Sequence, residues 1–385
     1  MGKSAWKIPL VEPKFTINGR FLTQAVTGVQ RFAVEVATAI DALIDSGECA
    51  VLDGRIEIVA PFTARDFPLR HIPIRRCGFG SGYFWEQAEL PLHARGRFII
   101  NFCGLGPVVA RNQLVVVHDA TVRARPENFS LPFRAAYNLL IPLLCRRALG
   151  TATVSEFSRR EIGKWYGVDV SNMRVCYVGA DHITRVVPDH SAIDRLGLSG
   201  RKFFLSVGAS NIKNADTAAS ALARAELSDT LLVLTGNRVY KIFGRPNDLS
   251  SHNVLHAGHV SDQELRALYE HALALVSPSR YEGFGLTPVE AMLLGCPAII
   301  SKTPAMIEIC GDAALQCDAD NADELARLMR LVHDNPTRRD AVIASGRARA
   351  ARFTWRATAS ILLNLCLSLS MEKLEIEQTY ERVNL

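Results

Sequence analysis

Short apolar runs alternate with helical patterns along almost the whole chain of 385 residues. The runs with strand character lie at 55–60, 98–102, 113–117, 151–154, 173–178, 203–207, 231–234, 254–257, 273–276 and 298–300. Helical patterns in the first half lie between them, at 29–43, 83–92, 133–149 and 156–165. Strands that alternate with helices form parallel sheets with helices on both faces. The pattern therefore predicts an α/β fold made of two Rossmann-like units in tandem.

The length of the chain predicts two domains, because a single hydrophobic core rarely grows beyond about 250–300 residues. We expect the first domain at 1–185 and the second at 186–354. The segment 181–199, which contains a proline and a glycine, is the best candidate for the linker between them. A further helical pattern begins at Trp355.

The composition is that of an ordinary globular protein, with 48% hydrophobic and 22% charged residues. The nine cysteines are scattered and include no C-x-x-C pair, so we expect reduced thiols in the cytosol and neither disulfides nor a zinc site. The N-terminal segment lacks the apolar core of a signal peptide, and no apolar run approaches the roughly 18 residues that span a bilayer. The sequence therefore predicts a cytoplasmic protein.

Positive charge is concentrated in the first half of the chain. Residues 1–185 contain 23 Lys and Arg against 16 Asp and Glu, whereas the remainder contains 21 against 23. Such an excess suits an acidic partner, either an anionic membrane surface or a lipid diphosphate, although scattered solvated charge explains it equally well. The apolar pattern at 133–149 is open to the same two interpretations, a membrane-facing helix or a helix of the core. No nucleic-acid-binding motif is present, so we expect no nucleic-acid partner.

The segment 277–301, SPSRYEGFGLTPVEAMLLGCPAIIS, is the most informative part of the chain. It places Glu282 and Glu290 eight residues apart around a Gly-Phe-Gly turn. Because Gly283 and Gly285 have no Cβ, the backbone there can bend sharply and approach a ligand closely. The two carboxylates then flank whatever ligand this turn binds.

A helix is expected to begin directly after the turn. Thr287 is a suitable N-cap, and Pro288 suits the first helical position. Free N–H groups at the positive end of a helix bind phosphate, so the turn predicts a diphosphate site. Glu290 has a second interpretation, because Thr287-x-x-Glu290 also fits a capping box.

This segment resembles the E-x7-E signature of the retaining, nucleotide-sugar-dependent glycosyltransferase family 4, the group 1 glycosyltransferases. The resemblance implies a GT-B fold, in which two tandem Rossmann-like domains with parallel sheets enclose an interdomain cleft. It also implies that the first domain binds the acceptor, that the second binds the nucleotide sugar, and that the C-terminal helix 355–385 packs back on the first domain. It further implies that Glu282 lies near the sugar, that Glu290 binds ribose hydroxyls, and that the donor diphosphate contacts Gly283, Phe284, Gly285 and Leu286.

Two segments of the first half resemble the same family. Gly28, in TGVQRF, resembles the first strand-to-helix turn, although it has one glycine where many members have two and also suits an ordinary turn. His118 and Asp119 follow the apolar strand VVV, and catalytic groups of open α/β sheets lie beyond strand carboxyl ends. The resemblance implies that His118 lies near the hydroxyls of the transferred sugar. Asp119 is expected either to cap the next turn or to orient the His118 ring.

The loop after the strand at 203–207 resembles the family's diphosphate-binding loop. Lys213 retains the expected lysine, but Ile212 stands where the family carries an arginine. Either one phosphate-binding cation is missing, or Arg280 supplies it. The Asp318-Ala-Asp320 sequence resembles a metal-binding D-x-D, but it precedes a capping box at 321–324, so we expect no metal and no cofactor.

Together these features predict a metal-independent, retaining hexosyltransferase with a nucleotide diphosphate sugar as co-substrate. Mannose from GDP-mannose is favoured. The expected acceptor is a saccharide or a polyprenyl-diphosphate-linked saccharide in cell-surface polysaccharide synthesis, which would place the protein in the cytoplasm or peripherally at the inner face of the membrane. The alternatives are another GT-B enzyme, a sugar-nucleotide epimerase or a phosphorylase, and a non-catalytic GT-B partner subunit.

Overall fold

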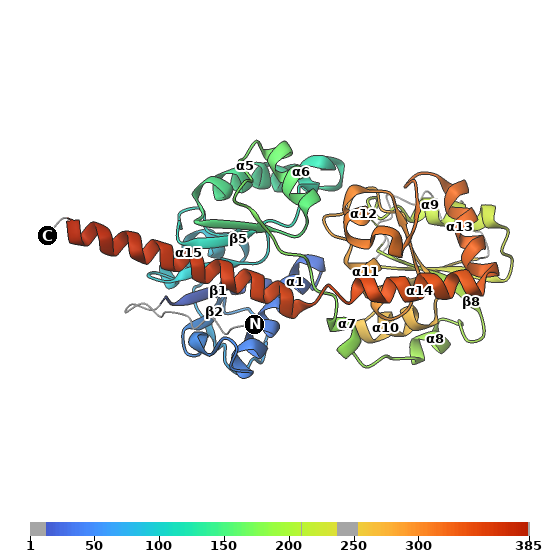
Figure 1. The fold of residues 1–385 in the computed structure, drawn as a ribbon, viewed down its shortest axis with the longest axis horizontal. Coiled ribbons are helices and arrows are strands. Elements are labelled where there is room, and N and C mark those ends of the chain that lie inside the picture. The colour runs from blue at the N-terminus through green and yellow to red at the C-terminus, as the bar shows by residue number, and fades with distance from the viewer. Residues whose placement is uncertain (1–12, 209, 237–252, 384–385) are drawn as a thin grey trace.

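The computed structural model describes residues 13–208, 210–236 and 253–383, and within them two lobes lie side by side, each built around one sheet (Figure 1). All strand pairings that define the two sheets are parallel. The first sheet has the order β3-β2-β1-β4-β5-β6-β7 and the second β10-β9-β8-β11-β12-β13. The predicted α/β fold with two tandem Rossmann-like units is confirmed.

The strands of the first sheet are β1 Phe15–Asn18, β2 Ile56–Ala60, β3 Ile74–Arg76, β4 Phe98–Asn101, β5 Gln113–Val116, β6 Gly150–Thr153 and β7 Arg174–Val175. Those of the second are β8 Lys202–Val207, β9 Thr230–Thr235, β10 Val254–Gly258, β11 Leu275–Ser277, β12 Ala298–Ser301 and β13 Leu315–Cys317. Each predicted strand is present, with ends that differ by a few residues. The exact boundary between the domains, placed at 185 from the sequence, stays a prediction.

Three strands had no counterpart in the sequence prediction: β1, β3 and β13. The central strand β1 is the instructive case, because all four of its residues are buried although two are polar. Thr16 accepts a hydrogen bond from Nε of Arg97, and the Asn18 side chain donates to Glu86 and Asn101. Distant partners thus satisfy the polar groups of a core strand, which therefore lacks the continuous apolar pattern.

The longer helices of the first lobe are α1 Gly28–Asp45, α5 Leu131–Arg147 and α6 Glu156–Tyr166. Those of the second are α9 Ala215–Ala225, α10 Asp262–His271, α11 Leu286–Leu293, α12 Pro304–Cys310, α13 Ala322–Asp334 and α14 Pro336–Ala350. The helix expected at 83–92 is interrupted: a single π-helical stretch, Trp85–Glu89, separates two short α-helical segments. Ser261 and Glu264 form a capping box at the start of α10.

The chain passes between the lobes twice. The first crossing contains α7 His182–Arg185 and α8 Ser191–Arg195, so the expected linker is partly helical. The second follows α14 and leads into α15 Trp355–Val383, which runs back across the first lobe (Figure 1). Trp355 packs edge-on against Phe32 of α1, with ring centroids 5.8 Å apart. The C-terminal helix therefore contributes to the core of the first domain.

Candidate functional site

A cavity of about 570 Å³ lies between the two lobes, where the carboxyl ends of their central strands face each other. Both domains contribute to its wall. The predicted site residues in that wall are Gly28, His118, Asp119, Lys213, Glu282, Gly283, Phe284, Gly285, Leu286 and Glu290. The structure thus brings together positions that are more than 250 residues apart in the chain, and what each residue does stays a prediction.

The helix after the Gly-Phe-Gly turn begins at Leu286, two residues earlier than predicted. Gly285 precedes it in a left-handed conformation, with φ of 92°, and a Cβ there would lie 2.6 Å from Sδ of Met306. The prediction of Thr287 as N-cap is wrong, and Pro288 is the third helical residue. Proline is tolerated there because the first N–H groups of a helix have no partner within it. Gly285, Leu286 and Thr287, at the start of α11, still line the cavity.

Glu290 does not form the capping box that the sequence also suggested, because no side chain caps α11. Its carboxylate is buried. One oxygen accepts a hydrogen bond from the Tyr269 hydroxyl at 3.1 Å, and the other lies 3.2 Å from Nε2 of His182. The α11 helix thus holds this glutamate against the cavity rather than using it to stabilise its own terminus.

The turn also docks on the first domain. A Cβ on Gly283 would lie 3.0 Å from Cβ of Asp119, so the close approach of the two lobes favours glycine at this position. The Gly283 carbonyl accepts hydrogen bonds from Oγ of Ser155 at 2.6 Å and Oγ of Ser158 at 3.0 Å, at the start of α6. Ser155 also caps α6, by accepting a hydrogen bond from the Ser158 N–H.

Lys213 and Glu282 form an ion pair inside this wall, with 2.6 Å between Nζ and Oε1. Their side chains are 28% and 13% exposed, so both remain in reach of a ligand. The lysine stem passes over Gly208, where a Cβ would lie 3.1 Å from Cγ of Lys213. The cation expected at the phosphates therefore lies beside the carboxylate expected at the sugar.

Arg280, the alternative source of a second cation, points elsewhere. Its Nη2 lies 2.6 Å from Oδ1 of Asp320, and its Nη1 donates to the Asn211 carbonyl. Asp320 belongs to the D-x-D sequence and is followed by Asn321, which caps α13 through a hydrogen bond from the Glu324 N–H. In the described ranges, no group of three or more His, Cys, Asp or Glu side chains is arranged to hold a metal.

His118 follows β5 and lies at the first-domain side of the cavity. Its Nε2 is 2.7 Å from the Phe102 carbonyl, and since a carbonyl only accepts, Nε2 carries the ring proton and Nδ1 is an acceptor. Burial lowers the pKa of His118, which keeps the ring neutral. Asp119 accepts from the Thr121 N–H at 2.7 Å, which is the turn-capping role, whereas the Phe102 carbonyl holds the ring.

Sequence reasoning missed Arg31, which lies one turn into α1 after Gly28 and lines the cavity. Its Nη2 donates to both carboxylate oxygens of Asp262 on α10, at 2.6 and 2.5 Å. This ion pair joins the two domains beside the cavity. The sequence places Arg31 three residues after Gly28, but nothing in it marks the partner Asp262.

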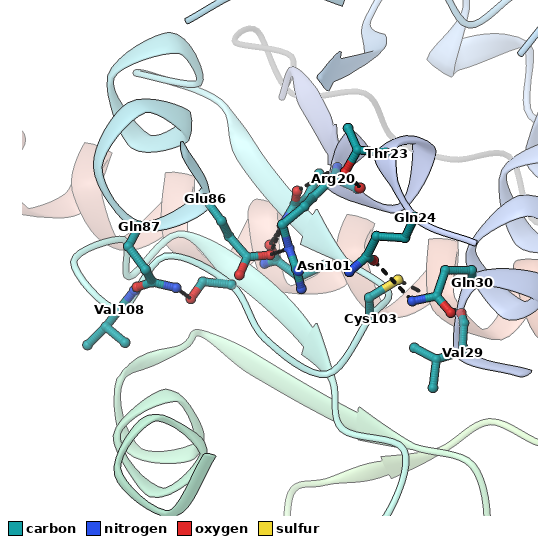
Figure 2. Close-up of polar contacts among 12 residues, drawn as sticks. Arg20, Thr23, Gln24, Val29, Gln30, Glu86, Gln87, Asn101, Cys103 and Val108 are labelled. Atoms are coloured by element: carbon teal, nitrogen blue, oxygen red, sulfur yellow. Dashed lines mark hydrogen bonds and ion pairs between the residues drawn. The ribbon is translucent and has the colours of Figure 1, made fainter. Parts of the chain in front are cut away.

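A second polar cluster lies at the carboxyl ends of β1 and β4, where the strand order changes direction (Figure 2). Arg20 Nε donates to Oε1 of Glu86 at 2.8 Å, and the two side chains are 4% and 0% exposed. Asn18 donates to the same carboxylate oxygen, while Oε2 of Glu86 has no hydrogen-bond partner among the described residues. The interrupted helix at 85–89 brings this glutamate into the core.

Residues 192–349 match the family model described as Glycosyl transferases group 1. The chain is 36% identical over 112 residues to an O-antigen chain mannosyltransferase B of Escherichia coli, which is 29% of each chain. It is 29% identical over 215 residues to the O-antigen chain mannosyltransferase RfbU of Salmonella typhimurium, covering 55% of this chain and 58% of that protein. These alignments span less than two thirds of either relative.

Solved structures match nearly the whole chain. A sucrose-phosphate synthase from Thermosynechococcus elongatus has a TM-score of 0.70 at 18% identity, over 94% of this chain and 99% of that one. Anabaena HepE in complex with UDP and glucose has a TM-score of 0.67 at 18% identity, over 93% and 100%. WaaG, a glycosyltransferase involved in lipopolysaccharide biosynthesis, has 0.66 at 16%, over 92% and 99%. The GT-B fold is confirmed, as is the resemblance to group 1 glycosyltransferases for the segment that contains Glu282 and Glu290.

Proposed function

We propose that this chain, whose second domain matches the group 1 glycosyltransferases, is a retaining glycosyltransferase that transfers a hexose from a nucleotide diphosphate sugar to a saccharide or lipid-linked saccharide. GDP-mannose is the favoured donor and mannose the favoured transferred sugar, because two relatives of this chain are mannosyltransferases by name. The names of two of them also favour a place in cell-surface polysaccharide synthesis. The observation that carries the proposal is the convergence of Lys213, Glu282, Glu290 and the start of α11 on one interdomain cavity.

In this proposal the donor diphosphate lies against the first turn of α11. The N–H groups there and the ammonium of Lys213 neutralise the negative charge that develops on the leaving diphosphate. To reach a phosphate oxygen, Lys213 exchanges its contact with Glu282 for one with the donor. A helix terminus and one cation supply the charge stabilisation that a metal provides in other transferases, so catalysis is proposed to need no metal and no cofactor.

The sugar lies between the domains. Glu282 accepts hydrogen bonds from its hydroxyls on one side, and the neutral His118 ring accepts one through Nδ1 on the other. Glu290 accepts from the ribose hydroxyls. Closure of the two lobes around the donor excludes water, which would otherwise hydrolyse it.

The acceptor is proposed to approach along the first domain, which carries the excess of positive charge. On its helix α5, Leu131 and Leu139 are 72% and 62% exposed, and Arg146 and Arg147 at its end are also exposed. Exposed leucines and arginines on one helix suit a lipid-linked acceptor and a peripheral position at the inner membrane face. No helix in the described ranges has the length and hydropathy of a membrane span.

A panel of nucleotide sugars tests the proposal. The melting temperature is measured with GDP-mannose, GDP-fucose, UDP-glucose, UDP-galactose and free GDP and UDP, because a ligand that binds only the folded state raises it. The donor that raises it most is then incubated with a saccharide acceptor, and the anomeric configuration of the product is read by NMR. Release of the epimerised sugar nucleotide, phosphorolysis with bound pyridoxal phosphate, or stabilisation by none of the panel would overturn the proposal.

A further inference from the structure

The two crossings between the domains lie against each other. The Ala180 N–H donates to the Phe353 carbonyl at 3.0 Å, and the Trp355 N–H donates to Oδ1 of Asp181 at 2.7 Å. A Cβ on Gly179 would come within 2.2 Å of the Trp355 nitrogen, so the two crossings approach this closely only because this residue is glycine. Any rotation of one lobe relative to the other acts on this paired segment.

A buried chain of polar contacts runs from this paired segment to the cavity. Trp355 Nε1 donates to Nδ1 of His182 at 3.0 Å, and Nε2 of His182 lies 3.2 Å from Oε1 of Glu290. The indole N–H can only donate, so Nδ1 of His182 is the acceptor and Nε2 carries a proton toward the carboxylate. Tyr269 donates to the other carboxylate oxygen at 3.1 Å. All four side chains are buried, between 1% and 5% exposed.

These contacts hold the Glu290 carboxylate in place but leave part of its capacity to accept hydrogen bonds unused. One oxygen accepts a hydrogen bond from the Tyr269 hydroxyl and the other is in contact with Nε2 of His182, and each oxygen has a further lone pair to offer. Burial and the neighbouring carboxylate raise the pKa of Tyr269 well above its ordinary value, so its hydroxyl stays a donor. Because Glu290 lines the cavity, the two remaining acceptor positions suit two adjacent hydroxyl groups of one ligand.

We propose that His182 is a positioning residue for recognition of the donor ribose: it holds the Glu290 carboxylate in place and ties it, through Trp355, to the paired crossings of the chain. The proposal rests on the assignment of Glu290 to the ribose under the proposed function. It adds a specific consequence, that the geometry of the two crossings and the strength of ribose binding depend on each other. His182 itself does not touch the donor.

The test is a thermodynamic cycle between protein variants and the ribose. Dissociation constants are measured by calorimetry for GDP and for 2′,3′-dideoxy-GDP, or for the UDP pair if the panel favours uridine, with wild type, Glu290→Ala, His182→Leu, His182→Gln and Trp355→Phe. His182→Leu should weaken binding of the ribose form about ten-fold, since it removes the polar contact to the Glu290 carboxylate, and leave the dideoxy form within about two-fold. His182→Gln, which can accept from Trp355 and donate to Glu290, should restore most of the loss.

Glu290→Ala tests the assignment of this carboxylate to the ribose, and His182→Leu tests the positioning role of the histidine. If Glu290→Ala does not discriminate between the two nucleotides, the ribose assignment itself fails. If Glu290→Ala discriminates but His182→Leu weakens both nucleotides equally, His182 is merely structural and the inference is overturned. Trp355→Phe removes the N–H and keeps an aromatic ring against Phe32, so a smaller loss of affinity for the ribose form than for His182→Leu is expected even if His182→Leu does not fold. His190→Leu, on the same crossing but 54% exposed and paired with Glu270, should change neither constant.

Discussion

Lys213 and Glu282 are each other's partners, with 2.6 Å between the ammonium nitrogen and the carboxylate oxygen. The cation and the carboxylate that we assign to opposite ends of the donor's glycosyl phosphate are therefore adjacent. A donor that binds here inserts its phosphate and its sugar next to an existing ion pair. The phosphate of the donor therefore competes with Glu282 for Lys213, and the sugar competes with Lys213 for Glu282. Mutation of each residue in turn can separate the two roles.

Lys213→Ala should lower kcat/KM about ten- to a hundred-fold. Lys213 is the cation of its loop, and Ile212 stands where the resemblance leads us to expect a second cation, an arginine. A charge-assisted contact to phosphate contributes roughly 1.5–3 kcal/mol. Arg280→Ala is the matched control, because Arg280 pairs with Asp320 instead of lining the cavity, and its kcat/KM should stay within about two-fold. The reverse result, a silent Lys213→Ala and an impaired Arg280→Ala, would exchange the roles of the two residues.

Glu282→Ala should abolish transfer while the protein stays folded. The side chain lies in a loop, and the Lys213 ammonium that it leaves behind is 28% exposed, so solvent can compensate for the lost partner. Product formation and the far-ultraviolet circular dichroism spectrum are the two measurements. Near-normal turnover by the folded variant would remove Glu282 from the mechanism.

Excess EDTA should leave the activity unchanged. The acidic D-x-D sequence is engaged elsewhere, since Asp320 pairs with Arg280 and the following Asn321 caps α13. The initial rate is compared with and without chelator at saturating donor. Loss of activity that Mn²⁺ or Mg²⁺ restores would contradict charge stabilisation by the α11 terminus and Lys213 alone.

The sequence predicted the parts of the site that lie within short segments. Glu282, the glycine turn and Glu290 are close in sequence, and His118 follows a strongly apolar strand, so strand ends and helix starts place them in the cleft. The start of α11 was misplaced because a left-handed Gly285 ends the turn earlier than the proline suggested. Local patterns predict where helices and strands lie. The exact residue at which α11 begins depends on how Gly285 packs against Met306.

Contacts between distant segments could not be predicted. Arg31 pairs with Asp262, 231 positions away, and His182 reaches both Trp355 and Glu290 across the crossings. No periodicity or spacing marks such pairs, because their members lie on different elements. His182 lay inside a segment expected to be a plain linker, and only the folded chain reveals its two partners.

His118 should make the folded state less stable in mild acid. Burial lowers its pKa in the folded protein below the ordinary value of about 6.5, so the unfolded chain binds the proton more tightly. The free energy of unfolding should therefore fall as the pH decreases from about 6.5 toward the folded pKa, by at most about 1.4 kcal/mol per pH unit from this group. Urea unfolding between pH 5 and 8 measures this change in the free energy of unfolding. His118→Gln, which retains a donor for the Phe102 carbonyl, should show a shallower fall, and an identical profile would exclude His118 as the cause.

The buried Arg20–Glu86 pair should show strong energetic coupling. Glu86→Gln leaves the Arg20 charge buried without a carboxylate, and breaking such a pair costs about 3–5 kcal/mol. Arg20→Met together with Glu86→Gln removes both charges and keeps an acceptor for Asn18, so the double variant should be more stable than Glu86→Gln alone. Urea unfolding of the two single variants and the double variant gives the coupling energy. The exposed Arg224–Asp323 pair, with 2.7 Å between its charged atoms, is the matched control and should couple by less than about 1 kcal/mol. Equal coupling in the two pairs would show that burial adds nothing to the interaction of Arg20 with Glu86.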